Sequence, residues 1–375
     1  MVPLTTIAGQ WLRIGTIGFG GPPAHIALLR RLCVERRGWL SDEEFTDGIA
    51  ACNLLPGPAS TQLAIYCAWR LRGTLGAIVG GVCFIAPGLV AILALSALLL
   101  RETPNRYVLG AAAGAGAAVA AVAVHAAVGL IPAAWQRVGA GRLAGRGRWV
   151  AYFAVGAVAA AVIGAWVALV LLLAGALETA ARTRPHRAVP LVLGPVGAGG
   201  LAAVAWVALK VGALSYGGGF VIIPLMQSDA VDRYHWLTGG QFLNAVALGQ
   251  ITPGPVVQTV SAVGYAAAGL GGGLLAAVVA FAPSFAFVLA GAPRFGRLRG
   301  DARASAFLAG AGPAAIGAIL GSAIPLALAL SQAWQYAVLA AAAVLLLLLR
   351  RGVVLTLLLC GVAGVVIALA GAPVG

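Results

Sequence analysis

The sequence predicts an all-α polytopic membrane protein built from two homologous repeats, and three observations lead to this fold class. The 375-residue chain is 61% hydrophobic and only 9% charged, with a mean hydropathy of +1.00, whereas a soluble domain carries roughly 25% charged residues. Apolar runs long enough to span a bilayer occur near 75–100, 107–131, 149–180, 270–293, 304–330 and 334–373. Finally, the two halves of the chain share one series of motifs.

The repeats are visible as motifs that recur at a constant offset, which is 197 residues up to the Pro-Gly-Pro motif and 196 after it. The matched pairs are Arg13 with Lys210, Gly20-Gly21 with Gly217-Gly218, Trp39-Leu40-Ser41 with Trp236-Leu237-Thr238, Pro56-Gly57-Pro58 with Pro253-Gly254-Pro255, and Gln62 with Gln258. A duplicated half in a hydrophobic chain is typical of secondary transporters, whose substrate site lies between the repeats. The sequence therefore predicts an N-terminal transmembrane repeat over 1–180, a linker over 181–203 and a C-terminal repeat over 204–375.

Each half predicts the same order of elements. A first helix, at about 4–30 and 204–227, contains the cation and ends in the glycine-rich break. A short connector carries the Trp-Leu-Ser or Trp-Leu-Thr box, and the Pro-Gly-Pro segment follows at about 45–69 and 242–267. A long helix, another helix and a final apolar pair complete each half. Arg350-Arg351 separates the last pair in the second half, and the pair of the first half is expected within 149–180.

The distribution of arginines between loops indicates that the repeats are inverted. The formal net charge of +14 comes mainly from arginines in short loops, which favours positive-inside topology over nucleic-acid binding. Four arginines follow the first helix of repeat one (30, 31, 36 and 37), against Arg233 alone in repeat two, and the bias reverses after the long helix. Matching loops are therefore expected on opposite sides of the membrane. Inversion requires an odd number of crossings per half, so each Pro-Gly-Pro segment is expected to be re-entrant.

The paired Pro-Gly-Pro motifs predict an anion site. A proline inside a helix costs about 3 kcal/mol, and non-helical backbone at membrane depth is tolerated only inside protein or beside a water-filled cavity. The second proline suits the start of a new helix, whose free N–H groups attract anions. The expected substrate-binding residues are both motifs and the polar residues around them, Asn53, Gln62, Gln250, Thr252 and Gln258. The alternative is a structural kink with no ligand.

The matched cations and glycines extend this predicted site. Arg13 and Lys210 lie in or beside apolar helices, and a charge within the membrane is a functional hypothesis by default. The alternative is that both side chains snorkel to the headgroups. Gly20, Gly21, Gly217 and Gly218 are expected to expose backbone N–H groups to the anion or to allow close approach of helices.

The ten acidic residues are too few, and too far from the predicted mid-spans, to build a sodium cage or a metal site. If protons drive transport, His25, Glu35 and Asp47 are the candidates, and the alternative is that each is a satisfied connector residue. No cofactor is expected, and the absence of a Walker motif argues against ATP drive within this chain. No cleavable signal peptide is visible, so a multi-pass protein of the inner (plasma) membrane is expected.

The motifs resemble the chromate ion transporter (CHR) family. The resemblance lies in FGGPPAHIA (19–27), RRGWLSDEEF (36–45) and LLPGPASTQLAIY (54–66), and in YGGGF (216–220), WLTGGQF and ITPGP of the second half. It covers roughly 13–100 and 210–293. It implies export of chromate, a divalent tetrahedral oxyanion, from the cytoplasm by a proton-driven antiporter that confers chromate resistance. Repeat two has Ile222 where repeat one has His25, so His25 cannot have a symmetric role.

Other functions stay open from the residues alone. Sulfate has the same charge and nearly the same shape as chromate, and a transporter of sulfate or another oxyanion, or a passive anion channel, would use the same site. A membrane enzyme acting on phosphate-bearing lipids is a remote alternative, because clustered carboxylates for Mg²⁺ are missing. The expected partners are the oxyanion, the lipid bilayer and, in a homodimer, a second copy of the chain.

Overall fold

In the computed structural model, residues 1–100, 104–136, 143–164, 166–182, 199–215, 220–292 and 301–374 are described, and within them the fold is all-helical. The first half contains α1 (Leu4–Ile17), α2 (Pro22–Arg30), η1 (Arg31–Arg36), α3 (Asp42–Cys52), α4 (Ala59–Leu99), α5 (Arg106–Ala117), α6 (Val119–Gln136), α7 (Leu143–Val158), η2 (Ala159–Ile163) and α8 (Val167–Arg182). The second half contains α9 (Leu201–Leu214), α10 (Ile222–Gln227), η4 (Ser228–Arg233), α11 (Gly239–Ile251), η5 (Val256–Gln258), α12 (Thr259–Gly291), α14 (Ala302–Leu328), α15 (Ala333–Ala343), η7 (Val344–Leu348) and α16 (Val353–Leu369). Residues 183–198 of the predicted linker lie outside the described residues, whereas its ends belong to α8 and α9.

The first helix of each half differs from the prediction. Residues 4–30 were expected to form one helix, but α1 ends at Ile17 and α2 begins at Pro22. Gly20 and Gly21 between them have positive φ angles of 95° and 74°, which glycine adopts at little cost. The break therefore lies inside the predicted helix and divides it into two short helices. In the second half α9 likewise ends at Leu214, and α10 begins at Ile222.

The Trp-Leu-hydroxyl boxes begin the next helix of each repeat. Ser41 Oγ accepts a hydrogen bond from Glu44 N at 3.1 Å, and Ser41 N donates to Glu44 Oε2 at 3.0 Å. Thr238 and Gln241 form the same two bonds at 3.2 and 2.9 Å. Because this capping box satisfies amides that a helix start leaves free, it explains why a hydroxyl recurs at this position in both halves.

The Pro-Gly-Pro motif forms the tip of a helical hairpin. In the first repeat, α3 and the start of α4 run side by side. Their close approach is seen at Gly48, where an added Cβ would lie closer than 3.0 Å to the Tyr66 ring. Arg70 donates to Glu44 near the other end of the same hairpin. The prediction of a broken or re-entrant helix in each repeat is thereby confirmed. In the second repeat α11 precedes the motif, and the 3₁₀ turn η5 leads into α12.

The long helix reverses direction at a matched glycine in both repeats. Gly73 has φ 61° and ψ −149° within α4, and Gly269 has φ 62° and ψ −154° within α12. A Cβ added at Gly76 would lie closer than 3.0 Å to Ala68 O, whereas eight residues of straight helix would separate them by roughly 12 Å. The chain therefore folds back on itself, and the longer apolar part of α4 begins at this turn.

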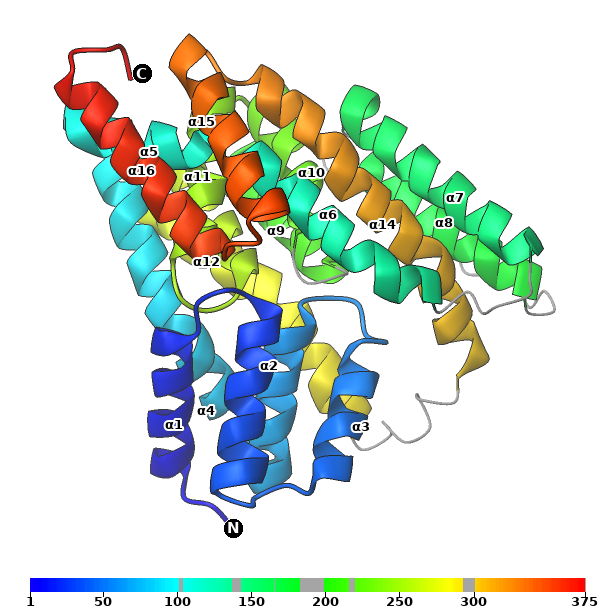
Figure 1. Ribbon diagram of the computed structural model, residues 1–375. Coiled ribbons are helices and arrows are strands. Elements are labelled where there is room, and N and C mark those ends of the chain that lie inside the picture. Colours follow the sequence, from blue (N-terminus) through cyan, green and yellow to red (C-terminus); the bar gives the residue numbers. More distant parts are fainter. Residues whose placement is uncertain are drawn as a thin grey trace.

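The final helices of each half pack against the other half (Figure 1). Helix α5 packs on α16, and α14 packs on α7 and α8. Matching residues make these contacts, since added Cβ atoms at Gly114 and Gly310 would lie within 3.0 Å of Cys360 O and Ala174 O respectively. Small residues allow such close helix approach in membranes. The two halves are therefore intertwined through these helices.

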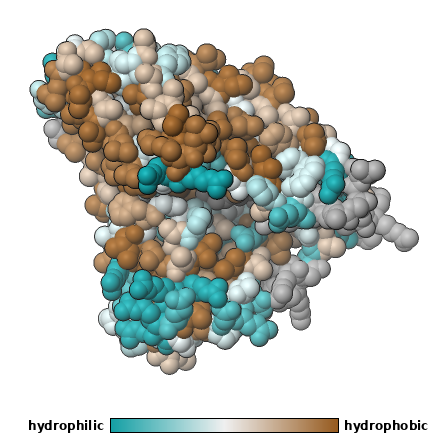
Figure 2. Space-filling view, in the orientation of Figure 1, coloured by the Kyte–Doolittle hydropathy of each residue, from teal (hydrophilic) through white to brown (hydrophobic). Residues whose placement is uncertain are grey.

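The outside of the described fold is suited to lipid. Five helical segments are long and apolar enough to cross a membrane, namely Ala59–Leu99, Arg106–Gln136, Gly145–Ile163, Val256–Gly291 and Ala302–Leu328. Val162, Leu328 and Leu348 are 78, 74 and 73% exposed. Hydrophobic side chains cover much of the surface in Figure 2, and hydrophilic ones gather at the end formed by the N-terminal helices. The all-α polytopic membrane class predicted from the sequence is confirmed.

Candidate functional site

The C-terminal end of the first helix of each repeat, α1 or α9, lies against the Pro-Gly-Pro turn of the other repeat. Gly254 N donates a hydrogen bond to Gly18 O at 2.9 Å. A Cβ added at Gly57 would lie 3.3 Å from Gly212 O, near the end of α9. The two contacts are reciprocal between the halves. They bring the two Pro-Gly-Pro turns to a shared central region, as expected for a site between repeats.

The second parts of α4 and α12 cross this region at matched positions. A Cβ added at Gly88 would lie closer than 3.0 Å to Pro253 O, and Ser284 Oγ lies 3.3 Å from the Cβ position of Gly57. Gly88 and Ser284 are equivalent in the two repeats. Each turn is therefore covered by the long helix of the opposite repeat.

The two matched glutamines are buried in the centre but bond differently. Gln62 Nε2 donates to Pro56 O at 2.7 Å and closes its own turn. Gln258 Nε2 donates to Ile85 O at 2.5 Å and so joins the two repeats. Each Nε2 donor faces a carbonyl, and each Oε1 is buried with no hydrogen-bond partner among the described residues. The two predicted ligands therefore have their amide donors occupied in this conformation.

Several buried hydroxyl groups around the turns have no hydrogen-bond partner in the described part of the chain. Thr61 Oγ1 lies in the first turn after Pro58, Ser215 is the residue directly after α9, and Ser284 Oγ lies beside Gly57. Buried polar groups are nearly always paired, so such groups require an explanation, for instance an ion or water that the site holds. Hydroxyl groups can donate to an oxyanion, and those of Thr61 and Ser284 both belong to the surroundings of the Pro-Gly-Pro turn of the first repeat.

The matched cations have different environments. Lys210 is 8% exposed and forms an ion pair with Asp229, which is 2% exposed. Arg13 lies on the exposed face of α1 with Leu12 and Ile17 and has no ion pair or hydrogen bond within the described residues. An exposed cation on an apolar helix face is also what snorkelling would produce.

Asp229 is the site residue that sequence reasoning missed. No acidic residue was expected inside an apolar span, but Asp229 is buried next to the only lysine of the chain. One signal was present. Lys210 stands seven residues before the glycine run 217–219 and Asp229 ten residues after it, so a reversal at that run would bring the two toward each other. Gly217 and Gly218 themselves lie outside the described residues.

His25 is fully buried and connects the first break to the start of α4. Its Nε2 lies 2.9 Å from Gly18 O, the oxygen that also accepts from Gly254 N, and its Nδ1 lies 3.3 Å from Ser60 Oγ. Phe84 packs edge-on against the ring at 5.0 Å between centroids. Because Gly18 O can only accept, Nε2 carries the proton and Nδ1 accepts from Ser60.

The other predicted residues lie in varied places. Glu35 is exposed, with Oε1 4.0 Å from Arg30 Nε, and Asp47 is half-buried with a partner. Asn53 and Gly20 are exposed. Thr252 Oγ1 donates to Leu248 O at 2.9 Å, whereas Gln250 Nε2 is buried with no partner among the described residues. Of the predicted set, Gly57, Pro58, Pro253, Gly254, Pro255 and the two glutamines gather at the centre, with Gly21 beside Val256.

Two intertwined apolar repeats around a polar centre define a multi-pass membrane transport protein. The sequence profile of the family described as chromate transporter matches residues 5–179 and 202–365. The chain therefore belongs to the chromate transporter family, as the motifs predicted, and is placed in the plasma membrane.

Named relatives cover most of the chain. A chromate transport protein of Cupriavidus metallidurans is 35% identical over 342 residues, which are 86% of this chain and 82% of the relative. A chromate transport protein of Pseudomonas aeruginosa is 32% identical over 343 residues, 85% of this chain and 80% of the relative. No solved structure matches the chain.

Proposed function

We propose that this chain is a secondary transporter that exports chromate from the cytoplasm, driven by the proton motive force, and thereby confers chromate resistance. The observation that carries this proposal is the reciprocal contact of each Pro-Gly-Pro turn with the end of the first helix of the other half, together with hydroxyls of Thr61, Ser215 and Ser284 that have no hydrogen-bond partner among the described residues. The substrate class follows from the family and from the names of the relatives.

In this proposal the oxyanion lies between the turns and accepts hydrogen bonds from the hydroxyls and from amides at the start of α4. A hydrogen bond to a charged group contributes about 1.5–3 kcal/mol net, so three or four such bonds hold a divalent anion without a metal. Lys210 supplies the positive charge. Arg13, on the exposed face of α1, is proposed to attract the anion as it approaches the site.

Alternating access is proposed to come from rocking of one repeat against the other, with inverted repeats over 1–180 and 204–375 joined by 181–203. The Gly254–Gly18 bond and the Gln258–Ile85 bond cross between the halves. Both would have to break or shift in each cycle. Each bond between neutral groups contributes about 1 kcal/mol, which is small enough to break at physiological temperature.

The test is chromate uptake into everted membrane vesicles, with and without a proton gradient and with sulfate as competitor. Accumulation that requires the proton motive force is expected, and Lys210→Gln is expected to reduce it at least tenfold at normal abundance. Arg233→Gln, which removes an exposed cation, is the matched control and should transport normally. Accumulation of sulfate in place of chromate would overturn the substrate.

A further inference from the structure

We propose that Asp229 is a proton-binding site coupled to the anion through Lys210, so that a proton and an oxyanion bind together and cross the membrane together. This inference rests on the anion transport proposed above. It deepens that function by naming the coupled group and the direction of proton movement.

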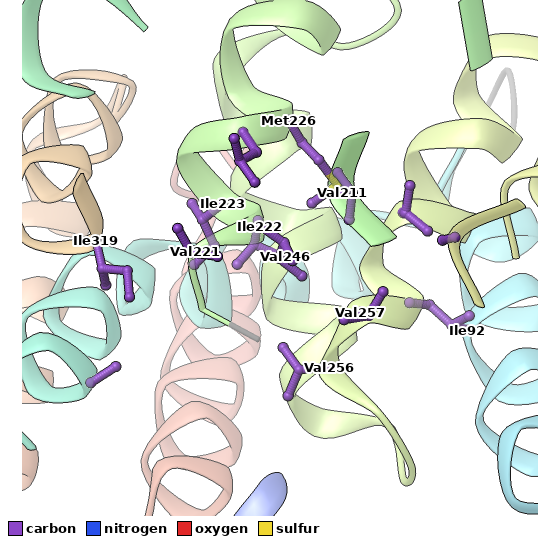
Figure 3. Close-up of a cluster of buried hydrophobic side chains, with 14 of the residues drawn as sticks. Ile92, Val211, Val221, Ile222, Ile223, Met226, Val246, Val256, Val257 and Ile319 are labelled. Carbon is purple, nitrogen blue, oxygen red and sulfur yellow. The ribbon is translucent and has the colours of Figure 1, made fainter. Parts of the chain in front are cut away.

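Lys210 and Asp229 form an isolated pair in an apolar setting. Val211, Val221, Ile222, Ile223 and Met226, their neighbours in sequence, belong to the cluster of buried hydrophobic side chains in Figure 3. Removing two charges from water is costly, and their attraction offsets this cost only while both are charged. When an anion pairs with the Lys210 ammonium in place of Asp229, the Asp229 carboxylate is left buried beside a second negative charge. This arrangement favours protonation of the carboxylate.

No other charged group on the described parts of the packed elements neutralises Asp229. On its own element Asp232 and Arg233 are exposed. Helices α9, α10 and α11 carry no ionisable residue besides Lys210. The remaining charged groups are on α8, where Glu178 pairs with Arg182 and with Arg148 of α7, and on α14, where Arg303 lies in the first turn.

A cavity lies beside the segment that carries Asp229, although neither Asp229 nor Lys210 lines it. It has a volume of about 190 Å³ and lies between η2, the α10–η4 segment and α14, with Gln227, Ser228 and Asp232 as its polar lining. Such a volume holds several water molecules. Ser228 Oγ is buried without a partner among the described residues, and Ser228 directly precedes Asp229. Water in the cavity can therefore carry a proton from the exposed Asp232 to the neighbourhood of Asp229.

Lys210 is close enough to the centre to serve the anion. It stands five residues before Ser215, the unpartnered hydroxyl at the end of α9, which is roughly 7 Å along the helix axis. Gly212, two residues after Lys210, contacts the Pro-Gly-Pro turn of the first repeat through its carbonyl. In the proposal, the flexible lysine side chain leaves Asp229 and rotates toward the Pro-Gly-Pro turns when the anion binds.

The Lys210–Asp229 ion pair has no counterpart at the matching positions of the first repeat. The residue of repeat one that matches Asp229 is Leu32, and the matching cation is the exposed Arg13. A structural requirement of the hairpin would be expected in both repeats. The asymmetry favours a role that a transporter needs once per cycle, namely one coupled proton.

The charge balance predicts how transport is driven. A divalent oxyanion with one proton moves one net negative charge outward. The inside-negative membrane potential drives this movement, whereas an alkaline interior opposes it. The proton therefore travels in the direction opposite to that of the antiporter expected from the family resemblance.

The decisive test uses the full-length wild-type protein in detergent with a pH indicator in weak buffer, at a pH where chromate is divalent. Addition of chromate should cause uptake of about one proton per bound anion. Over the pH range in which Asp229 is charged in the free protein, the apparent Kd for chromate should increase about tenfold for each unit by which the pH is raised. Sulfate, which stays divalent across the range, is the second probe. Binding without proton uptake would overturn the inference and leave the transporter intact.

Three variants separate coupling from a purely structural role. Asp229→Asn should bind chromate with little dependence on pH and without proton uptake, while Glu43→Gln, an exposed carboxylate of α3, should behave as wild type. The double variant Lys210→Met/Asp229→Leu removes both buried charges and should fold but not bind. Coupled binding by this double variant would overturn the inference even if Asp229→Asn fails to fold. If wild type binds neither chromate nor sulfate, the transporter proposal and this inference fall together.

Discussion

Gly88→Ala is the sharpest test of the contact between the two repeats. Gly88 lies in the second part of α4, against the Pro-Gly-Pro turn of the other half. A Cβ at this position would approach Pro253 O and Gln258 Oε1 closer than 3.0 Å. The Gln258 side chain could turn away only by losing its bond to Ile85 O. The Pro253 carbonyl is backbone, next to Gly254, whose N–H is bonded to Gly18 O.

The expected cost of this methyl group follows from these contacts. Relieving the contact with Pro253 requires α4 and the turn to separate by on the order of 1 Å, and overpacking of this kind costs about 1–3 kcal/mol. Loss of the Gln258 bond adds about 1 kcal/mol. A shift of this size at a binding site can reduce activity roughly 100-fold. The variant should therefore lose far more transport than stability.

The assay compares Gly88→Ala with Gly271→Ala, a helical glycine of α12 whose added Cβ would meet nothing within 4 Å. Chromate uptake by vesicles and the melting temperature of the detergent-solubilised protein are measured for both. Gly271→Ala should be fully active, and slightly more stable because alanine favours helix. Equal activity and equal melting temperatures of the two variants would refute the described contact between α4 and the opposite turn.

Two further predictions address the turns and the topology. Pro255→Ala should lower uptake roughly tenfold or more, because the broken helix can then extend through the turn. The control Pro132→Ala, at an exposed position within α6, should leave uptake unchanged. Similar losses in both variants would show that the turn has no special role. Single cysteines at Ser41 and Thr238, the matched and exposed N-caps of α3 and α11, should react with an impermeant thiol reagent from opposite sides of the membrane, and labelling from one side would exclude inverted repeats.

The glycine and proline positions show why the local features could be predicted. Gly57 and Gly254 have φ angles of 118° and 91°, a conformation that glycine adopts readily, and the flanking prolines end and begin helices. These preferences act within a few residues. The breaks, the hairpin tips and the capping boxes are therefore encoded in the motifs themselves, and apolar composition determines the membrane class.

Long-range pairing could not be predicted in the same way. Arg13 and Lys210 match in sequence, yet one is exposed and the other buried against Asp229. The difference depends on the residue that the following segment of each repeat offers to the cation. In the second repeat this residue is Asp229, which pairs with Lys210. In the first repeat the matching position is Leu32, which cannot pair with Arg13. The first helix was also predicted as one span, since hydropathy does not distinguish a straight helix from a hairpin of two short ones.

By itself the sequence determined that this protein is a helical membrane protein with two repeats of the chromate transporter family, each interrupted at Pro-Gly-Pro. Only the tertiary structure decided that each turn contacts the end of the first helix of the other half, that α5 and α14 pack on helices of the opposite repeat, and that Lys210 has a buried carboxylate partner. The physical reason is range. Backbone preferences of glycine and proline act locally and can be read along the chain, whereas the surroundings of a buried charge are set by segments that meet only after folding.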